Sequence, residues 1–146
     1  MMSSVLDIAV KFAQIASYCA GAFAAVSAFF LYRSNSRRER ARWAEGLYVR
    51  FFEQSKLKEV RDALDCDAPN PRVTKLVSDE SSDWTDYLNF FEFVAYLQSS
   101  RQLLEQDVQA PFGYYLQCLK KHQTVLDYIR DRSKGFDYLR EMLLNE

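Results

Sequence analysis

One stretch near the amino end constrains the fold of this chain more than any other feature. From Phe12 to Tyr32 the sequence contains no Asp, Glu, Lys or Arg. An α-helix rises ~1.5 Å per residue, so a run of this length reaches about 30 Å, the thickness of the hydrocarbon core of a bilayer. The arginines follow the run instead of preceding it, unlike those of a cleaved signal peptide. The sequence therefore predicts one transmembrane helix over residues 12–32, after a short extracytoplasmic leader of residues 1–11.

Charge is distributed unevenly on the two sides of this segment. Residues 1–42 contain six basic and two acidic side chains, whereas residues 43–146 contain thirteen basic and eighteen acidic ones. Because Lys and Arg near a span favour the cytoplasmic side, we expect the amino end to face outwards, in the inner membrane of a bacterium. The basic segment 33–42 is expected to contact lipid headgroups, with polyanion binding as the alternative. Its candidate contacts are Arg33, Arg37, Arg38, Arg40 and Arg42.

Small side chains recur along the predicted span. Helices associate in lipid where small residues let their backbones approach closely. This pattern predicts a homo-oligomer formed through the span, and a smooth face on a lone anchor is the alternative. The residues on this face are Ala16, Ala20, Gly21, Ala24 and Ala28.

The remainder of the chain, residues 43–146, is expected to form a cytosolic helical domain. Only four Gly and three Pro occur in the whole sequence, and apolar residues follow a helical spacing. We expect Ser34 to Ser36 to interrupt or cap the helix that leaves the membrane, helices over 43–64 and from Ser82 or Asp83 to about Ser99, and a loop over 65–83. A third helix should begin at Pro111 and run to about 130, and Gly135 should separate it from a final helix. The fold class is therefore all-α, a transmembrane helix followed by a bundle of about four helices.

The chemistry of an enzyme or a metal site is not evident in the sequence. Cys19, Cys66 and Cys118 lack CxxC spacing and His122 is the only histidine, so one chain cannot assemble a Cys and His zinc site. Cys118 and His122 lie four residues apart, but a catalytic pair also needs an orienting third group. We therefore expect a protein without catalytic activity, cofactor or metal.

Two polar residues stand out on the aromatic-rich helix that begins near Ser82. Asn89 and Glu92 lie three positions apart among three phenylalanines. A carboxylate is costly to bury without a partner. We expect an internal salt bridge from Glu92 to Arg61, Arg130 or Arg132; a functional polar pocket is the alternative.

Residues 120–132 form a basic segment in an otherwise acidic domain. If two or more protomers brought these segments together, the basic side chains would form a cleft for a phosphorylated ligand such as a cyclic oligonucleotide. Tyr114, Tyr115 and Tyr128 would be available to stack on a base. Solvated charges near the carboxyl end of a helix are the alternative reading. Duplex nucleic acid is not an expected partner. The candidate phosphate contacts are Lys120, Lys121, His122, Arg130 and Arg132.

The segment Leu88-Asn89-Phe90-Phe91-Glu92-Phe93-Val94-Ala95 resembles the LNxxE-type helix of an uncharacterised bacterial family. Members of that family are short proteins with one amino-terminal span and a cytosolic helical domain. The resemblance extends over most of residues 40–146 and implies this architecture, but no activity. A looser similarity of layout is to small membrane effectors of bacterial antiviral systems, including those of type III CRISPR loci. The residues that follow the same pattern are Phe112, Tyr115, Val125, Ile129 and Arg132.

These observations predict a self-associating, single-pass membrane protein without enzymatic activity. In the leading hypothesis its cytosolic domain senses a signal or partner and acts on the membrane, as an antiviral effector gated by a cyclic oligonucleotide would. In the alternative hypothesis it is a static anchor or scaffold that recruits a cytosolic protein.

Overall fold

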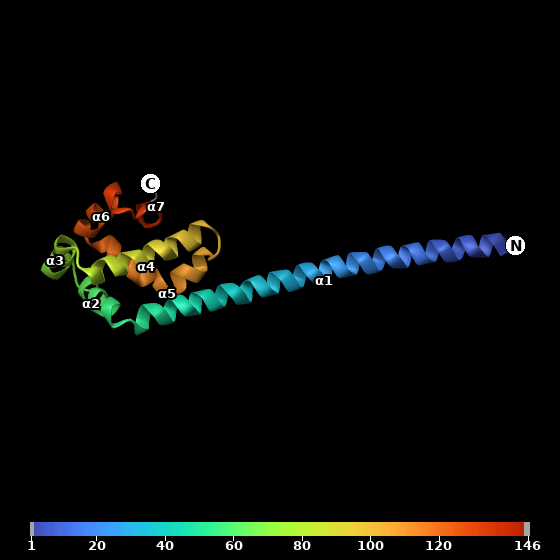
Figure 1. The fold of residues 1–146 in the computed structure, drawn as a ribbon, viewed down its shortest axis with the longest axis horizontal. Coiled ribbons are helices and arrows are strands. Elements are labelled where there is room, and N and C mark those ends of the chain that lie inside the picture. Colours follow the sequence, from blue (N-terminus) through green and yellow to red (C-terminus); the bar gives the residue numbers. More distant parts are fainter. Residues whose placement is uncertain (1, 145–146) are drawn as a thin grey trace. The chain divides into compact units, whose positions relative to one another are not determined.

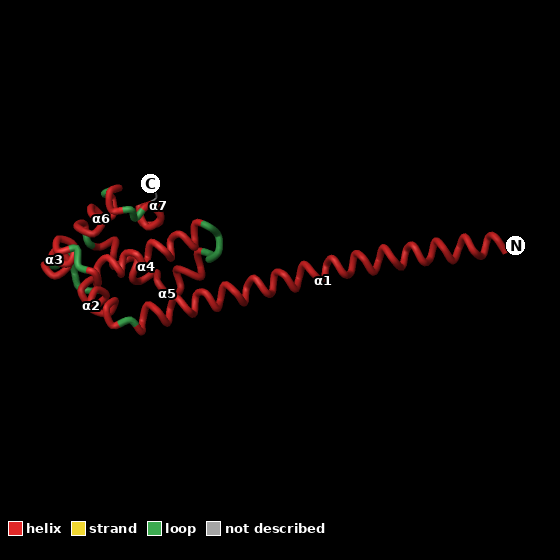
Figure 2. The backbone as a smooth tube through the Cα atoms, viewed as in Figure 1, coloured by secondary structure: helices red, strands yellow, loops and turns green. Residues whose placement is uncertain are grey.

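The structure is a computed structural model that describes the backbone of residues 2–144. It describes the side chains of residue 11 and residues 17–144. All the regular structure in this part of the chain is helical, which confirms the all-α part of the predicted fold class (Figures 1 and 2). The chain divides into two units, residues 1–39 and residues 40–146.

Helix α1 runs from Met2 to Glu53 without interruption. The prediction that Ser34 to Ser36 would interrupt or cap it is wrong. Ser and Asn in a helix interior each cost well under ~1 kcal/mol relative to Ala, which is too little to end a helix with strong formers on both sides. Among the residues that it describes, the structure contains no helix with the length and apolar character needed to cross a membrane. The predicted span covers residues 12–32, and the side chains of residues 12–16 lie outside the described residues.

The helix predicted over residues 43–64 is in fact two helices. Gln54 has an extended backbone, with φ −73° and ψ 111°, and separates α1 from α2, which runs from Ser55 to Leu64. The predicted apolar stripe is buried, with Trp43 as the exception at 52% exposed. The buried members are Leu47, Phe51, Leu57, Val60 and Leu64.

The segment predicted as a loop over 65–83 contains helix α3, Pro71–Asp79. The Asn70 side chain caps it by accepting from the Arg72 N–H at 2.9 Å, and Pro71 occupies the first helical position, where its missing N–H costs nothing. Helix α4 follows from Ser82 to Ser99, as predicted at its carboxyl end. Its cap is Ser81 instead of Ser82 or Asp83.

The helix predicted to begin at Pro111 begins six residues earlier. Helix α5 runs from Glu105 to Lys121 and contains Pro111 in its interior. It starts where the Asp107 carboxylate accepts from the Leu104 N–H at 3.0 Å. The extended backbone of His122 then separates α5 from helix α6, Gln123–Arg130, so the predicted third helix is again two helices.

A short 3₁₀ helix, η1, spans Arg132–Lys134 and ends at Gly135. Gly135 has φ 79°, a left-handed conformation that glycine adopts without strain. The separation predicted there is confirmed, and the final helix α7 runs from Asp137 to Leu144. Within residues 40–146 the described chain therefore has six α-helices after α1 instead of a bundle of about four.

The core of residues 40–146 is aromatic and is centred on Phe51 near the end of α1. The Phe51 side chain is fully buried, and its ring contacts rings from α4 and α5. Helix α4 lies in the middle of the packing, against α2, α5 and α7. The rings around Phe51 belong to Phe52, Tyr87, Phe90, Phe91, Phe112 and Tyr115.

Candidate ligand site at the end of α1

The end of α1 is held by a buried arginine on α2. Arg61 is 9% exposed, and its guanidinium donates a hydrogen bond to the Phe51 carbonyl. The guanidinium carbon also lies 4.8 Å from the centroid of the Phe51 ring and 4.9 Å from that of Phe52. The last carbonyls of a helix have no partner within the helix, so a cation there satisfies one of them and interacts favourably with the helix dipole. Arg61 therefore fastens the end of α1 to α2.

A cavity of about 580 Å³ lies beside this junction, which we call the junction cavity. Its volume is within the range of small-molecule sites. Three segments form it: the last turn of α1, the start of α2, and one face of α4 with residues at helical spacings of three and four. The lining residues are Arg50, Glu53, Gln54, Ser55, Lys56, Asp86, Asn89, Phe90 and Phe93.

Two phenylalanines give the junction cavity its apolar surface. Phe90 is 7% exposed and stacks on Phe51 with 5.0 Å between ring centroids, so the core holds it in place. Phe93 is one turn further along α4 and is 41% exposed. One ring is thus a fixed part of the core, and the other has surface available for contact.

Four ionised side chains of the junction cavity comprise two cations and two anions. Lys56 and Asp86 form an ion pair across α2 and α4, with Nζ and Oδ2 3.9 Å apart. Arg50 and Glu53, one turn apart on α1, have no ion-pair partner among the described residues. The cavity therefore offers one free charge of each sign on the same helix turn.

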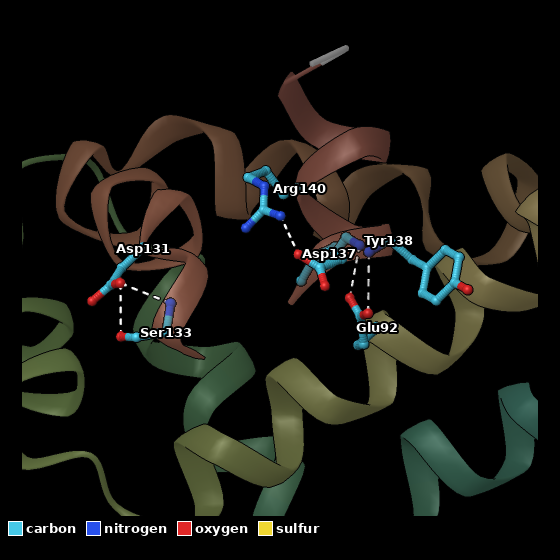
Figure 3. Close-up of polar contacts among 7 residues, drawn as sticks. Glu92, Asp131, Ser133, Asp137, Tyr138 and Arg140 are labelled. Carbon is cyan, nitrogen blue, oxygen red and sulfur yellow. Dashed lines mark hydrogen bonds and ion pairs between the residues drawn. The ribbon is translucent and has the colours of Figure 1, made fainter. Parts of the chain in front are cut away.

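Asn89 is exposed and lines the junction cavity, but Glu92 does not. The predicted salt bridge from Glu92 to Arg61, Arg130 or Arg132 is wrong. Figure 3 shows that the Glu92 carboxylate accepts hydrogen bonds from the backbone N–H groups of Tyr138, at 3.1 Å, and Leu139, at 2.7 Å. These N–H groups belong to the first turn of α7 and lack partners within the helix, so Glu92 caps α7 from α4.

The five residues proposed as phosphate contacts do not form one site within the chain. Lys121 and His122 line a cavity of about 260 Å³ beside the start of α3, while Arg130 pairs with Asp127 at 3.1 Å. The His122 side chain is 3% exposed, and its Nε2 lies 3.2 Å from the Leu64 carbonyl. The two positions left, Lys120 and Arg132, are exposed.

His122 and Arg130 therefore make contacts within the domain, and Lys121 lies beside one of them. The five residues do not surround a common point where a phosphate could bind. Tyr128 is engaged as well, because Lys134 lies over its ring at 5.0 Å.

The structure also shows where the residues of the span and of the basic segment lie. Ala20, Gly21, Ala24 and Ala28 are exposed, and an added Cβ at Gly21 would meet no atom within 4 Å. Ala16 lies among the side chains outside the described residues.

Of the five arginines predicted to contact lipid, Arg40 forms an ion pair with Asp107 on α5, with Nε and Oδ2 3.8 Å apart. The remaining four, Arg33, Arg37, Arg38 and Arg42, are exposed.

Cys118 and Tyr87 are ionisable groups within the core. Burial raises the pKa of the Cys118 thiol, which opposes formation of a nucleophilic thiolate. Burial also raises the pKa of Tyr87, whose hydroxyl has no hydrogen-bond partner among the described residues. No group of three or more Cys, His, Asp or Glu within the described part of the chain is arranged to hold a metal.

Sequence reasoning found Asn89 but missed Arg50, Glu53, Lys56 and Asp86. In the sequence these are ordinary surface charges, and only the packing of α4 against the α1 and α2 junction brings them around one cavity. The signal available was the spacing of Asp86, Asn89, Phe90 and Phe93 on one face of a helix.

Comparisons of the chain with protein-family models, with curated proteins and with solved structures find no match. The resemblance to the LNxxE-type family therefore stays a prediction, and the site rests on its own geometry.

Proposed function

We propose that this is a self-associating, single-pass membrane protein whose helical domain, residues 40–146, binds a signal or partner in the cytosol and acts on the membrane. The observation that carries the proposal is the uncharged segment from Phe12 to Tyr32, followed by arginines. The large apolar side chains of its second half support it, because they are exposed: Phe23 is 75% exposed and Leu31 72%. Soluble proteins rarely leave an apolar surface of this extent uncovered.

Fractionation of cells that produce the full-length protein tests the membrane part. We expect the protein to sediment with membranes and to resist extraction by alkaline carbonate. An Ala20→Arg, Ala24→Arg variant should shift to the supernatant, since each arginine at the centre of a span costs about 2.5–3.5 kcal/mol on insertion scales. A wild-type protein that stays in the aqueous supernatant without detergent would refute the proposal.

The orientation has its own test. An alkaline phosphatase fusion at Glu146 should be inactive and a green fluorescent protein fusion should fluoresce, because the domain is proposed to lie in the cytosol. The reverse result would place the domain on the other side.

Self-association through the small residues is tested by cross-linking in membranes. Gly21→Leu should reduce the cross-linked dimer, because a large side chain keeps the backbones apart. Phe23→Leu, on the same helix, is the control and should leave the dimer unchanged. Equal dimer yields from all three proteins would argue against this face.

The arrangement of basic residues gives no support to the more specific version in which a cyclic oligonucleotide gates the protein. His122 is buried against Leu64, and Arg130 is paired with Asp127. Calorimetry of the full-length protein in detergent against a panel of cyclic oligonucleotides remains the direct test, and flat heats would remove that version.

A second candidate function, a membrane anchor that recruits a cytosolic protein, is favoured by an exposed aromatic cluster. Phe93, Tyr96 and Tyr138 are 41%, 41% and 40% exposed and contact one another in series across α4 and α7. Exposed aromatic residues are enriched at protein interfaces. Loss of membrane potential on overproduction would favour the first function, and harmless expression with a co-purifying protein that is lost on Phe93→Ala would favour the second.

A further inference from the structure

The junction cavity is a place where one bound molecule would touch both α1 and α4. Arg50 and Glu53 lie on the last turn of α1, and Asn89 and Phe93 lie on α4. Phe51, between these two residues of α1, is fixed in the core. A ligand here would therefore add contacts between the end of the long helix and the centre of the bundle.

The charges of the cavity select the net charge of its ligand. Its two cations and two anions cancel, and Lys56 already lies 3.9 Å from Asp86. A polyanion such as a nucleotide would meet two carboxylates, and a polycation would meet Arg50 and Lys56. Opposite charges favour binding and like charges oppose it, so a ligand with one charge of each sign fits best.

The positions of the two free charges narrow the choice further. Residues three apart on a helix are neighbours on its surface, with Cβ atoms about 5–6 Å apart. Arg50 can hold a carboxylate with two parallel hydrogen bonds, and Glu53 can accept from an ammonium group. The Asn89 side chain has both a donor and an acceptor and faces the same cavity.

The aromatic side of the cavity selects a flat apolar group. Phe93 has exposed ring surface, and Phe90 supports the cavity from the core. Aromatic rings pair at centroid distances of about 4.5–7 Å and contribute ~0.5–1.5 kcal/mol beyond the burial of area. A planar side chain attached to a zwitterionic group satisfies both sides of the cavity at once.

We infer that the junction cavity binds a small zwitterion with a planar apolar side chain, the chemistry of an aromatic α-amino acid. Arg50 binds its carboxylate, Glu53 binds its ammonium group, and Phe93 contacts its ring. Binding joins the end of α1 to α4. The consequence for the membrane rests on the function proposed above, but the binding itself does not.

Isothermal titration calorimetry of the full-length protein in non-ionic detergent tests this inference with four probes. L-Tryptophan should bind, while tryptamine, which lacks the carboxylate, and indole-3-propionate, which lacks the ammonium group, should each bind at least about tenfold more weakly, because each loses a charge-assisted interaction. AMP, a nucleotide probe, should bind no better than the two truncated probes. Absence of tryptophan binding, or tighter binding of AMP than of tryptophan, would overturn the inference.

Substitutions connect each probe to a residue. Tryptophan should bind to Arg50→Gln as weakly as tryptamine binds to the wild type. It should bind to Glu53→Gln as weakly as indole-3-propionate binds to the wild type. Each variant lacks the side chain that contacts the charged group missing from that probe. The control Lys58→Gln changes an exposed charge on α2 outside the cavity and should leave all four affinities unchanged. Tryptophan binding that is equally tight in all three variants would place the ligand elsewhere and refute the assignment.

The result is independent of the proposed membrane role. If the protein sediments with membranes and tryptophan does not bind, this inference fails and the proposed function stands. If tryptophan binds with the expected pattern and the protein is found in the aqueous supernatant, the inference stands and the membrane proposal fails.

Discussion

The described phenylalanine side chains are exposed in one of the two units of the chain and mostly buried in the other. In residues 1–39, Phe29 and Phe30 are 59% and 64% exposed, whereas in residues 40–146 Phe51 and Phe91 are fully buried. In the second unit the aromatic side chains drive folding in water by burying one another. In the first unit Phe29 and Phe30 contact each other but stay more than half exposed, so their free energy depends on what surrounds the helix. Apolar residues thus form a core in residues 40–146, whereas in residues 1–39 they form an exposed surface whose stability depends on the medium around it.

The largest expected effect sets Phe51 against Phe30. Phe51→Ala should lower the free energy of unfolding by about 3–5 kcal/mol, because it empties the centre of the aromatic core. Phe30→Ala should change it by less than about 0.5 kcal/mol, because the Phe30 side chain is already 64% exposed. The measurement is guanidinium denaturation of the full-length protein in non-ionic detergent, followed by fluorescence of the buried Trp84. Similar losses in the free energy of unfolding for the two variants would contradict the distinction between exposed aromatic residues in 1–39 and core aromatic residues in 40–146.

The next effect concerns Arg61, a charge buried among aromatic rings. Arg61→Ala should lower the free energy of unfolding by about 2–4 kcal/mol, the sum of a hydrogen bond from a charged donor and cation–π contacts. Arg61→Lys should give a smaller loss, since the charge stays but the planar fork is absent. Arg72→Ala, at an exposed arginine of α3, is the control and should have little effect. If Arg61→Ala were as mild as the control, Arg61 would not hold the end of α1.

A smaller effect is expected from Glu92, which joins α4 to α7. Glu92→Ala should cost about 1–2 kcal/mol and increase hydrogen exchange at the Tyr138 and Leu139 amides, which it caps. Glu92→Gln should have about half that effect, because its amide oxygen still accepts a hydrogen bond but carries no charge. Both measurements are made on the full-length protein in detergent.

Two further variants decide between the cap and the salt bridge expected from the sequence. Glu141→Ala removes an exposed acid of α7 and should leave exchange at the Leu139 amide unchanged. Arg130→Ala should also leave it unchanged; an increase equal to that of Glu92→Ala would restore the salt bridge.

The helical spacing of apolar residues is sufficient to predict the all-α character of the fold and most of the buried faces. It placed Phe91 and Val94 inside, and Gly135 marked a real break. The breaks at Gln54 and His122 were missed because neither residue is a helix breaker by type. At His122 the ring is buried beside the Leu64 carbonyl, a contact between residues that are far apart in the sequence.

The candidate site was less accessible to sequence reasoning, for a related reason. A buried residue reveals itself by its type and spacing, whereas Arg50 and Glu53 are charged, exposed and ordinary in composition. Their relevance comes from Asp86 and Phe93 on α4, which only tertiary packing brings to the same cavity. The role of Glu92 was hidden in the same way, because the groups that it caps are backbone N–H groups and leave no trace in the sequence.

The smallest expected effect lies in a surface turn of the folded unit and depends on pH. The Ser133 hydroxyl and backbone N–H donate to the Asp131 carboxylate at 2.7 and 2.9 Å and lower its pKa below the usual value (Figure 3). A carboxyl group with a lower pKa in the folded state binds protons more weakly than in the unfolded state. Its stabilising contribution is therefore complete above the unfolded pKa, near 4, and is lost as the pH falls through the folded pKa. Asp131→Asn should slightly flatten the loss of stability below about pH 4 in thermal unfolding, and Asp62→Asn, at an exposed acid of α2, is the control. If Asp131→Asn left the loss of stability at low pH unchanged, the Asp131–Ser133 hydrogen bonds would not form in solution. An exposed turn of residues 40–146 would then gain as little from contacts within the chain as the exposed side chains of residues 1–39.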